Sequence, residues 1–150
     1  METFSKYAIS TVFVAFLCIL INSNTDVVAE GSKDKQAWVS KGDALNRMGN
    51  FSQAIMAYDT ALKIDPNYVN ALDGKGWSLN ELGNFTQAIV YLDKALKIDP
   101  NHLDALVFKA QALYNTGNYT GAKYYSDKAL KIDPKSPAVK RLPEVFRKAQ

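Results

Sequence analysis

The sequence predicts an all-α protein in which three pairs of short helices stack into an α-solenoid, with a further helix capping the C-terminal end. The segment Ala-Leu-Lys-Ile-Asp-Pro occurs three times, beginning at Ala61, Ala95 and Ala129, with a spacing of 34 residues each time. A repeat of this length, holding one supersecondary unit, is typical of solenoid proteins. The polar–apolar alternation of a half-buried β-strand is not found along the chain.

The same offset aligns a glycine, an asparagine and an aromatic residue at 49–51, 83–85 and 117–119. Glycine accepts the left-handed conformation in which many helices end, and asparagine is a favoured N-cap of the next helix. Gln53 and Gln87 stand in the capping-box position, whereas Gly121 occupies it in the third unit, so we expect that helix start to be weaker. Each second helix ends at Asp-Pro, because proline disfavours helix in the residue before it.

Residues at fixed positions of the units resemble the tetratricopeptide repeat. The family pattern of aromatic, glycine, large apolar, aromatic, alanine, aromatic, alanine and proline falls in repeat 1 on Trp38, Gly42, Leu45, Phe51, Ala54, Tyr58, Ala61 and Pro66. In repeat 2 it falls on Leu72, Gly76, Leu79, Phe85, Ala88, Leu92, Ala95 and Pro100. In repeat 3 it falls on Leu106, Ala110, Leu113, Tyr119, Ala122, Ser126, Ala129 and Pro134, where Ala110 and Ser126 depart from it and are expected to loosen the packing. The resemblance implies a right-handed superhelix with repeats at 35–68, 69–102 and 103–136.

The N-terminal residues 1–29 differ in composition from the repeats. Lys6 precedes an almost wholly apolar run at 8–21, and small or modest residues at 27–29 precede an expected cleavage site. This order fits a secretory signal peptide. A membrane anchor over residues 4–28 is the main alternative, although the 14-residue run would span only about 21 Å as a helix. A core helix is disfavoured because the segment lacks a polar face. We therefore expect an exported chain that is secreted, held in the cell envelope or membrane-anchored, with residues 30–34 as a linker.

The C-terminal residues 137–150 are predicted to form an amphipathic helix that covers the last repeat. Ser136-Pro137 is a helix-start pair, and Pro143 should kink or split the helix. The apolar residues that fall on one face are Ala138, Val139, Leu142, Val145, Phe146 and Ala149. The basic residues on the other face are interpreted as solvated, with a membrane-surface or partner-binding face as the alternative.

Residue types that carry catalysis are scarce. The chain has one cysteine, Cys18 in the apolar N-terminal run, and one histidine, His102 in a predicted turn. Residues so far apart in sequence do not suggest a cysteine–histidine metal site or nucleophile pair. The formal net charge of +3 is not arranged as one basic stripe, which gives nucleic-acid binding little support. We expect no enzymatic activity, no cofactor and no metal site.

The resemblance further implies that the first helices of successive repeats line a concave groove. The groove residues it implies are Gln36, Val39, Asp43, Asn46 and Arg47 in repeat 1, Asn70, Asp73, Trp77, Asn80 and Glu81 in repeat 2, and Asp104, Val107, Gln111, Tyr114 and Asn115 in repeat 3. Amides can bond both donors and acceptors of an extended peptide, and Trp77 and Tyr114 are typical interface anchors. A core position is the alternative for Trp77, whereas Trp38 is expected to pack against its paired helix.

These features predict a protein–protein interaction module outside the cytoplasm that binds a peptide or a partner helix in the groove. The alternative is a structural adaptor that assembles a membrane or envelope complex through its ends or convex face. Some members of the family clamp acidic chaperone tails with Lys, Asn and Arg. The matching positions here are Val39, Asp43, Gly74, Asp104 and Phe108, so we do not expect that ligand.

Asn50, Asn84 and Asn118 each begin an Asn-x-Ser/Thr triplet in the same predicted turn of successive repeats. On an exported chain such triplets are candidate N-glycan acceptors. The alternative is that the asparagine only caps the helix that follows it.

Overall fold

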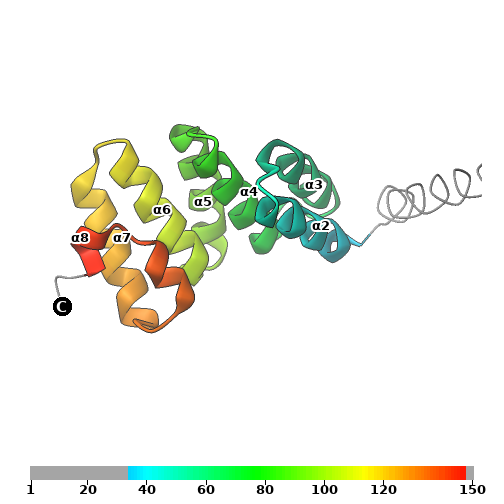
Figure 1. Cartoon of the computed structure of the whole chain (residues 1–150). Helices are drawn as coiled ribbons and strands as arrows, with labels where there is room; N and C mark the ends of the chain where they lie inside the picture. Colours follow the sequence, from blue (N-terminus) through cyan, green and yellow to red (C-terminus); the bar gives the residue numbers. More distant parts are fainter. Residues whose placement is uncertain (1–33, 148–150) are drawn as a thin grey trace, which may run out of the picture. The chain divides into compact units, whose positions relative to one another are not determined.

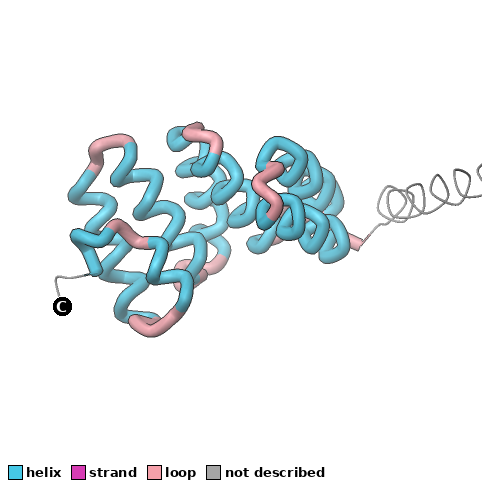
Figure 2. The backbone as a smooth tube through the Cα atoms, in the orientation of Figure 1, coloured by secondary structure: helices cyan, strands magenta, loops and turns pink. Residues whose placement is uncertain are grey.

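Six helices of similar length follow the 34-residue repeat through residues 34–147, the part of the chain that the computed structural model describes. The pairs are α2 (Lys35–Arg47) with α3 (Phe51–Ile64), α4 (Val69–Glu81) with α5 (Phe85–Ile98), and α6 (Leu103–Asn115) with α7 (Tyr119–Ile132) (Figure 1). Every regular element among these residues is helical, which confirms the all-α prediction (Figure 2). The predicted export or anchor segment lies outside the described residues. None of the helices within 34–147 is long and apolar enough to span a membrane.

The chain leaves the first helix of each pair through a glycine in the left-handed region. Gly49, Gly83 and Gly117 have φ values of 77°, 77° and 82°. In the first turn the Asn50 amide donates to the Leu45 carbonyl at 2.9 Å, which closes the helix end as in a Schellman motif. The predicted glycine exits are therefore confirmed.

The caps of the second helices differ from the prediction. The side chains of Asn50 and Asn84 make no capping hydrogen bond, so the predicted capping boxes do not form. Asn118 does cap its helix, since its Oδ1 accepts from the Gly121 amide at 2.9 Å. A Cβ at Gly121 would lie 3.0 Å from that oxygen, so the missing side chain makes room for the cap. The expectation that Gly121 weakens this helix start is wrong in this respect.

Glycines in the first helices receive a large side chain from α3. Tyr58 is fully buried, and a Cβ added at Gly42 or Gly74 would lie 2.6 or 2.5 Å from its ring or hydroxyl-bearing carbon. Those distances are far below van der Waals contact. Close approach of α2 and α4 to Tyr58 therefore requires glycine at both positions. Trp38 is buried, as expected of a packing residue.

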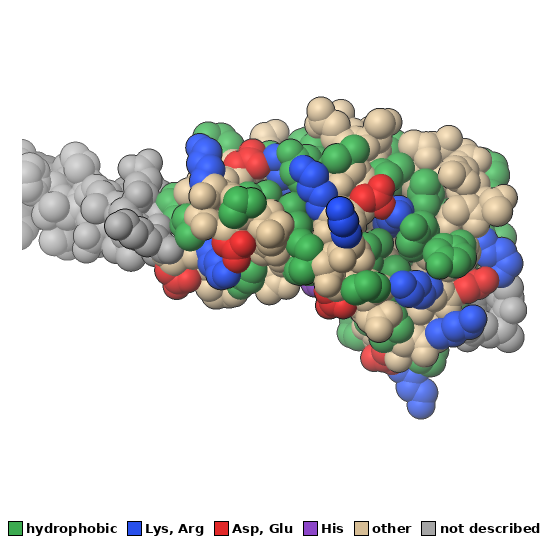
Figure 3. All heavy atoms as spheres, turned by 180° about the vertical axis from the view of Figure 1, so that it is seen from behind, with side chains coloured by type: hydrophobic (Ala, Val, Ile, Leu, Met, Phe, Trp, Pro, Cys, Tyr) green, Lys and Arg blue, Asp and Glu red, His purple; other side chains and the backbone are tan. Residues whose placement is uncertain are grey.

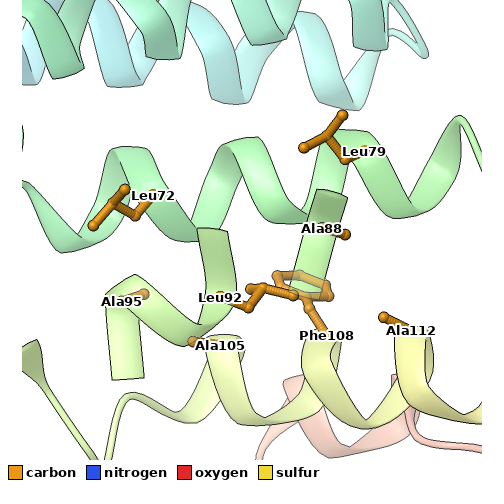
Figure 4. Packing of buried hydrophobic residues seen from close by; sticks show 8 residues of the cluster. All are labelled: Leu72, Leu79, Ala88, Leu92, Ala95, Ala105, Phe108 and Ala112. Atoms are coloured by element: carbon orange, nitrogen blue, oxygen red, sulfur yellow. The ribbon is translucent and has the colours of Figure 1, made fainter. Parts of the chain in front are cut away.

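Two apolar clusters form the core. The first joins the second repeat to α6 through Leu72, Leu79, Ala88, Leu92, Ala95, Ala105, Phe108 and Ala112. Figure 4 shows the Leu92 side chain beside the Phe108 ring, between α5 and α6. The second joins α6 and α7 to the C-terminal segment through Leu106, Val107, Ala110, Ala129, Leu130, Ala138, Val139 and Leu142.

Paired lysines link neighbouring repeats. The ammonium of Lys75 on α4 bonds to Asp59 of α3 and donates to the Tyr91 hydroxyl of α5 at 2.9 Å. One repeat later, Lys109 on α6 bonds to Asp93 of α5 and donates at 2.6 Å to the Tyr125 hydroxyl of α7. Burial opposes the charge of each lysine, but the hydrogen bonds to its aspartate and tyrosine hold its pKa above the ordinary value.

The predicted C-terminal helix is split, as Pro143 led us to expect. Residues Pro137–Arg141 form a 3₁₀ helix, η1, and Glu144–Arg147 form the short helix α8. Leu142, directly before Pro143, is extended, the conformation that a following proline favours. The segment folds back beside α6 and α7 (Figure 1).

Only part of the predicted apolar face of this segment is covered. Ala138, Val139 and Leu142 are buried in the second cluster, which confirms their role as a cover for the last repeat. Phe146 packs edge-on against Tyr114 with ring centroids 5.9 Å apart. Val145 is exposed, which corrects its placement on the apolar face, because the break at Pro143 changes the direction in which later residues point. Ala149 lies outside the described residues.

Candidate functional site

The first helices of the three repeats line an open pocket of about 300 Å³, to which η1 and His102, just before α6, each add one side chain. α2 and α4 are in contact, as are α4 and α6, so residues far apart in sequence share one wall. The lining residues are Gln36, Val39, Asp43, Asn70, Asp73, Gly74, Trp77, His102, Asp104, Phe108 and Arg141.

Three carboxylates and one guanidinium set the charge of the pocket. Asp43 accepts a hydrogen bond from the Tyr58 hydroxyl at 2.7 Å, which fixes one of its oxygens. Asp104 lies 3.9 Å from a guanidinium nitrogen of Arg141, a long ion pair. Asp73 is only 8% exposed, and its Oδ1 has no hydrogen-bond donor among the described residues. The pocket therefore holds more carboxylates than cations to match them.

Burial, together with these neighbouring charges, shifts the pKa values of Asp73 and Tyr58. Burial raises the pKa of Asp73 well above its ordinary value, and the nearby charges of Asp104 and Asp43 raise it further, whereas Arg141 lowers it. Burial, followed by the hydrogen bond to Asp43, also raises the pKa of Tyr58. The Tyr58 hydroxyl therefore keeps its proton and remains a hydrogen-bond donor. Asp73 is the pocket carboxylate whose charged form would be stabilised most by a further positive charge nearby.

Two aromatic rings form the apolar wall of the pocket. Trp77 of α4 and Phe108 of α6 are stacked, with centroids 5.6 Å apart and an interplanar angle of 1°. The guanidinium carbon of Arg141 lies 4.9 Å from the Trp77 centroid and 5.3 Å from that of Phe108. Trp77 also donates from Nε1 to Glu81 at 3.1 Å. Trp77 is half-buried, since it packs against the first core cluster and lines the pocket.

The structure brings together only part of the predicted groove set. Of the residues implied by the resemblance, those that line the pocket are Gln36, Val39, Asp43, Asn70, Asp73, Trp77 and Asp104. Their contact with a partner stays a prediction.

Two predicted amides are engaged inside the fold instead. Asn46 donates to the Tyr58 hydroxyl at 3.1 Å, and its carbonyl accepts from the Ser78 hydroxyl at 2.8 Å. Asn80 donates to the Phe108 carbonyl at 2.8 Å. Both are buried. Their hydrogen bonds hold neighbouring first helices together, so these donors are not presented to a peptide.

The predicted groove residues of repeat 3 lie mostly outside the pocket. Gln111 and Tyr114 do not line it, and Tyr114 packs edge-on against Tyr119 with centroids 5.3 Å apart. Val107 is fully buried in the second cluster, which corrects its placement on the groove. The physical reason is that η1 packs against α6 and covers the surface that the groove would otherwise extend along. Glu81, Arg47 and Asn115 are exposed outside the lining.

Arg141 lines the pocket but was not among the predicted groove residues. It lies after the last repeat, so no equivalent residue in another repeat marks it. His102, expected to be a turn residue, also lines the pocket, and its Nε2 lies 3.5 Å from the Asn70 side-chain oxygen. A basic residue following a proline-started turn at the end of the array is the signal that could have pointed to Arg141.

Other predicted sites stay predictions. Asn50, Asn84 and Asn118 are all exposed in the turns between paired helices, as an N-glycan acceptor must be. Within residues 34–147 there is no group of three or more His, Cys, Asp or Glu side chains placed to hold a metal ion.

The three helix pairs stack so that their first helices lie side by side and line one pocket. This arrangement defines a helical-repeat solenoid. Two sequence models described as tetratricopeptide repeat match the chain, one at residues 36–68 and one at 79–143. The chain belongs to the tetratricopeptide repeat family, as the resemblance predicted. A search of curated proteins found no match to the sequence.

Solved structures of the same fold are similar along most of the described residues. The TPR domain of Arabidopsis OM64 is 22% identical, with 77% of this chain and 96% of that chain covered and a TM-score of 0.69. The first TPR of Spaghetti (RPAP3), bound to the HSP90 peptide SRMEEVD, is 18% identical with coverages of 78% and 90% and a TM-score of 0.70. The TPR2B domain of yeast Sti1 in complex with pHsp70 is 22% identical with coverages of 77% and 94% and a TM-score of 0.68. At these identities the similarity concerns the fold.

Proposed function

We propose that this chain is a non-catalytic protein-interaction module that binds a peptide or partner helix through the pocket on its first helices. The observation that carries the proposal is the pocket itself, where the stacked rings of Trp77 and Phe108 lie beside the incompletely paired carboxylate of Asp73. A concave, partly apolar site with a few converging polar groups is the usual form of a ligand site. The Spaghetti and Sti1 structures, which have peptide or chaperone ligands, support a binding role for this fold.

The ligand is proposed to differ in charge from those chaperone tails. The peptide in the Spaghetti structure, SRMEEVD, has three acidic residues among its last four. In this chain Asp43, Asp73 and Asp104 line the pocket, and Arg141 is the one Lys or Arg side chain among the described residues that lines it. Like charges brought together in a poorly solvated site oppose binding. Titration of MEEVD, the part of that peptide without its arginine, into the full chain should therefore show no saturable binding. Saturation with dependence on Trp77 would contradict this part of the proposal.

Selection of a displayed peptide library against the full chain tests the binding function. Selected peptides should lose affinity for a Trp77→Ala variant, because truncating a central aromatic hot spot costs about 2 kcal/mol or more of binding. The melting temperature of the variant should stay within a few degrees of wild type. If the melting transition collapses instead, Trp77 serves mainly the core, where such a truncation costs about 3–5 kcal/mol of folding free energy.

A structural adaptor that uses the convex face is the second candidate, and one observation favours it. Met56, Val90 and Tyr124 occupy equivalent positions on α3, α5 and α7, and are 70%, 49% and 62% exposed. Exposed apolar residues that recur along an array can form a docking surface. Tyr124→Ser, which lies outside the pocket, is thus the matched control for Trp77→Ala. Complex assembly that survives Trp77→Ala and fails in Tyr124→Ser would favour the adaptor.

We also propose that the module works outside the cytoplasm, either released or anchored by residues 4–28. The order of charged, apolar and small residues in the first 29 positions supports this. Mass spectrometry of the protein from its own cells should find a chain that starts near Glu30, or an intact N-terminus in the membrane fraction. Intact chain that is soluble in the cytoplasm would refute both versions. Added glycan mass at Asn50, Asn84 or Asn118 would independently support export.

A further inference from the structure

Arg141 reaches from η1 over the pocket although its backbone belongs to the segment that covers the last repeat. The neighbouring side chains of Val139 and Leu142 are buried and hold the backbone in place. The Arg141 side chain itself is 47% exposed. Its guanidinium carbon lies 4.9 Å from the Trp77 centroid, a cation–π distance. An arginine side chain of this protein therefore occupies the space beside the aromatic wall.

Arg141 compensates the negative charge of the pocket only in part. Its distance of 3.9 Å to Asp104 is too long for a hydrogen bond. The Oδ1 atom of Asp73 is buried and receives no hydrogen bond from the described residues. Burial and the charges of Asp104 and Asp43 raise the pKa of Asp73, which means that they disfavour its charged form. A further cation nearby would stabilise that form. The pocket therefore has room for closer contact between a guanidinium and its carboxylates than the contact that Arg141 makes.

We propose that the pocket is a subsite for a guanidinium group, which a partner peptide fills with an arginine side chain, displacing Arg141 as the internal occupant. The inference rests on the proposed peptide-binding function and names the side chain that the pocket would take.

Arginine fits this site better than lysine does. A guanidinium is flat and weakly hydrated, so it stacks on aromatic faces, and its donors match carboxylates in pairs. The stacked rings of Trp77 and Phe108 offer the flat surface, and Asp73 and Asp104 offer acceptors on α4 and α6. A lysine ammonium is a compact point charge that would use the carboxylates but gain less from the rings.

Displacement requires only the Arg141 side chain to swing away. An ion pair of two half-exposed groups contributes little stability, and Val139 and Leu142 keep η1 in place without Arg141. An internal occupant lowers the apparent affinity for an external ligand in proportion to the fraction of time it blocks the site. Removing the Arg141 charge should therefore strengthen the binding of an external guanidinium.

The two tryptophans of the chain make a direct test feasible in the full-length protein. The indole N–H signal of Trp77 reports on the pocket, and that of buried Trp38 is the internal reference. N-acetyl-arginine amide is titrated as the probe, and N-acetyl-citrulline amide, which has nearly the same shape without the charge, as the control probe. We expect the arginine probe to shift Trp77 with an apparent Kd about tenfold lower in Arg141→Gln than in wild type. The citrulline probe should not bind either protein.

Lys140→Gln is the matched control variant, because Lys140 is exposed in the same 3₁₀ helix and does not line the pocket. It removes the same charge and should leave the apparent Kd of the arginine probe within about twofold of wild type. In the Arg141→Gln background, Asp104→Asn should reverse much of the gain. Equal or weaker arginine binding in Arg141→Gln, or equal binding of citrulline, would overturn the inference.

The selected library peptides separate this inference from the proposed function. If peptides that depend on Trp77 keep their affinity when each arginine is replaced by citrulline, the guanidinium subsite is wrong and groove binding stands. If the arginine probe binds at Trp77 while no peptide or protein ligand depends on Trp77, the subsite stands and the proposed function fails.

Discussion

At the scale of single residues, Asp73 is a carboxylate whose burial lowers the stability of the fold at neutral pH. It is buried on α4 with one oxygen lacking a donor among the described residues, and its pKa is raised well above the ordinary value of 3.8. A group whose pKa is higher in the folded state binds its proton more tightly there. Its contribution to stability is therefore fully present below about pH 4 and is lost as the pH rises through the raised folded-state pKa.

Asp73→Asn should consequently stabilise the protein at neutral pH. Removing the buried charge should raise the free energy of unfolding at pH 7 by about 1 kcal/mol or more. The gain should shrink toward zero at about pH 4, where wild-type Asp73 is protonated. Urea denaturation at both pH values measures the difference. Asp127→Asn is the control, because its exposed ion pair with Lys123 should contribute no more than about 0.5 kcal/mol. An equal gain at both pH values would show that charge burial is not the cause.

Gly74 shows a second residue-scale constraint, since it faces a side chain that has little freedom to move. A Cβ there would lie 2.5 Å from the Tyr58 ring, and Tyr58 is fixed by its hydrogen bonds to Asp43 and Asn46. Gly74→Ala should lower the free energy of unfolding by about 1–2 kcal/mol, even after the gain of about 1 kcal/mol in helix propensity.

Thermal melting checks this loss against Gly121→Ala. A Cβ at Gly121 would meet only the exposed Asn118 side chain, so the lost cap and the gained propensity should nearly cancel. A Gly74→Ala variant as stable as wild type would mean that Tyr58 has another well-packed position.

At the scale of the elements, the lysine that joins three helices recurs from one repeat to the next. Lys109 joins α5, α6 and α7 through Asp93 and Tyr125, and Lys75 makes the equivalent contacts one repeat earlier. Lys109→Met should cost about 1 kcal/mol, because the exposed part of Asp93 can return to water while the Tyr125 hydroxyl loses its neighbour.

Double-mutant cycles by chemical denaturation separate local from distant coupling. Lys109→Met and Asp93→Asn share one contact and should couple by about 0.5 kcal/mol or more. Lys75→Met and Lys109→Met use different partners and should be additive within about 0.5 kcal/mol. Strong coupling between the two lysines would contradict a purely nearest-neighbour arrangement.

The helices also show what the sequence could and could not predict. Helix ends follow from local chemistry, so Gly49, Gly83 and Gly117 mark them without knowledge of the fold. The repeat positions also predict part of the pocket wall on α2, α4 and α6, including Asp43, Asp73 and Trp77. They do not predict which amides are used between helices, as Asn46 and Asn80 are, because that depends on the neighbouring repeat.

The repeat pattern could not predict the position of Arg141 for a related reason. It has no counterpart in a repeat, and its position over Trp77 depends on a 3₁₀ turn and on the break at Pro143. The periodicity predicted a continuous helical face up to that break. Tertiary contacts between the last helix pair and a non-repeating segment decide where such a side chain lies.

At the scale of the whole folded unit, an array of repeats gains stability from each interface between neighbours and leaves an apolar face at its last helix pair. In residues 34–147 that face is covered by the C-terminal segment, which buries Ala138, Val139 and Leu142 against α6 and α7. The same segment places Arg141 over the pocket. The cover of the array and the occupant of the pocket are therefore one piece of chain.

Deleting residues 137–150 should thus have two separable effects. The loss of the buried contacts should uncover Leu106, Val107 and Leu130, lower the melting temperature and promote association, because exposed apolar faces at the end of an array are poorly soluble. Thermal melting and light scattering at several protein concentrations measure these two changes. The loss of Arg141 should in addition free the pocket for the arginine probe at concentrations where the truncated chain stays monomeric.

Two full-length variants divide these effects between the residues that cause them. Val139→Asp places a charge in the second core cluster and should reproduce the lower melting temperature and the association, since an unpaired buried charge strongly destabilises a core. Arg141→Gln should leave the melting temperature nearly unchanged, because its ion pair with Asp104 is long and half-exposed, and should affect only the pocket. A truncated chain that is as stable and as monomeric as wild type would show that the last helix pair needs no cover. In that event the role of residues 137–142 would be to place Arg141 over the pocket, and the fold would not depend on them.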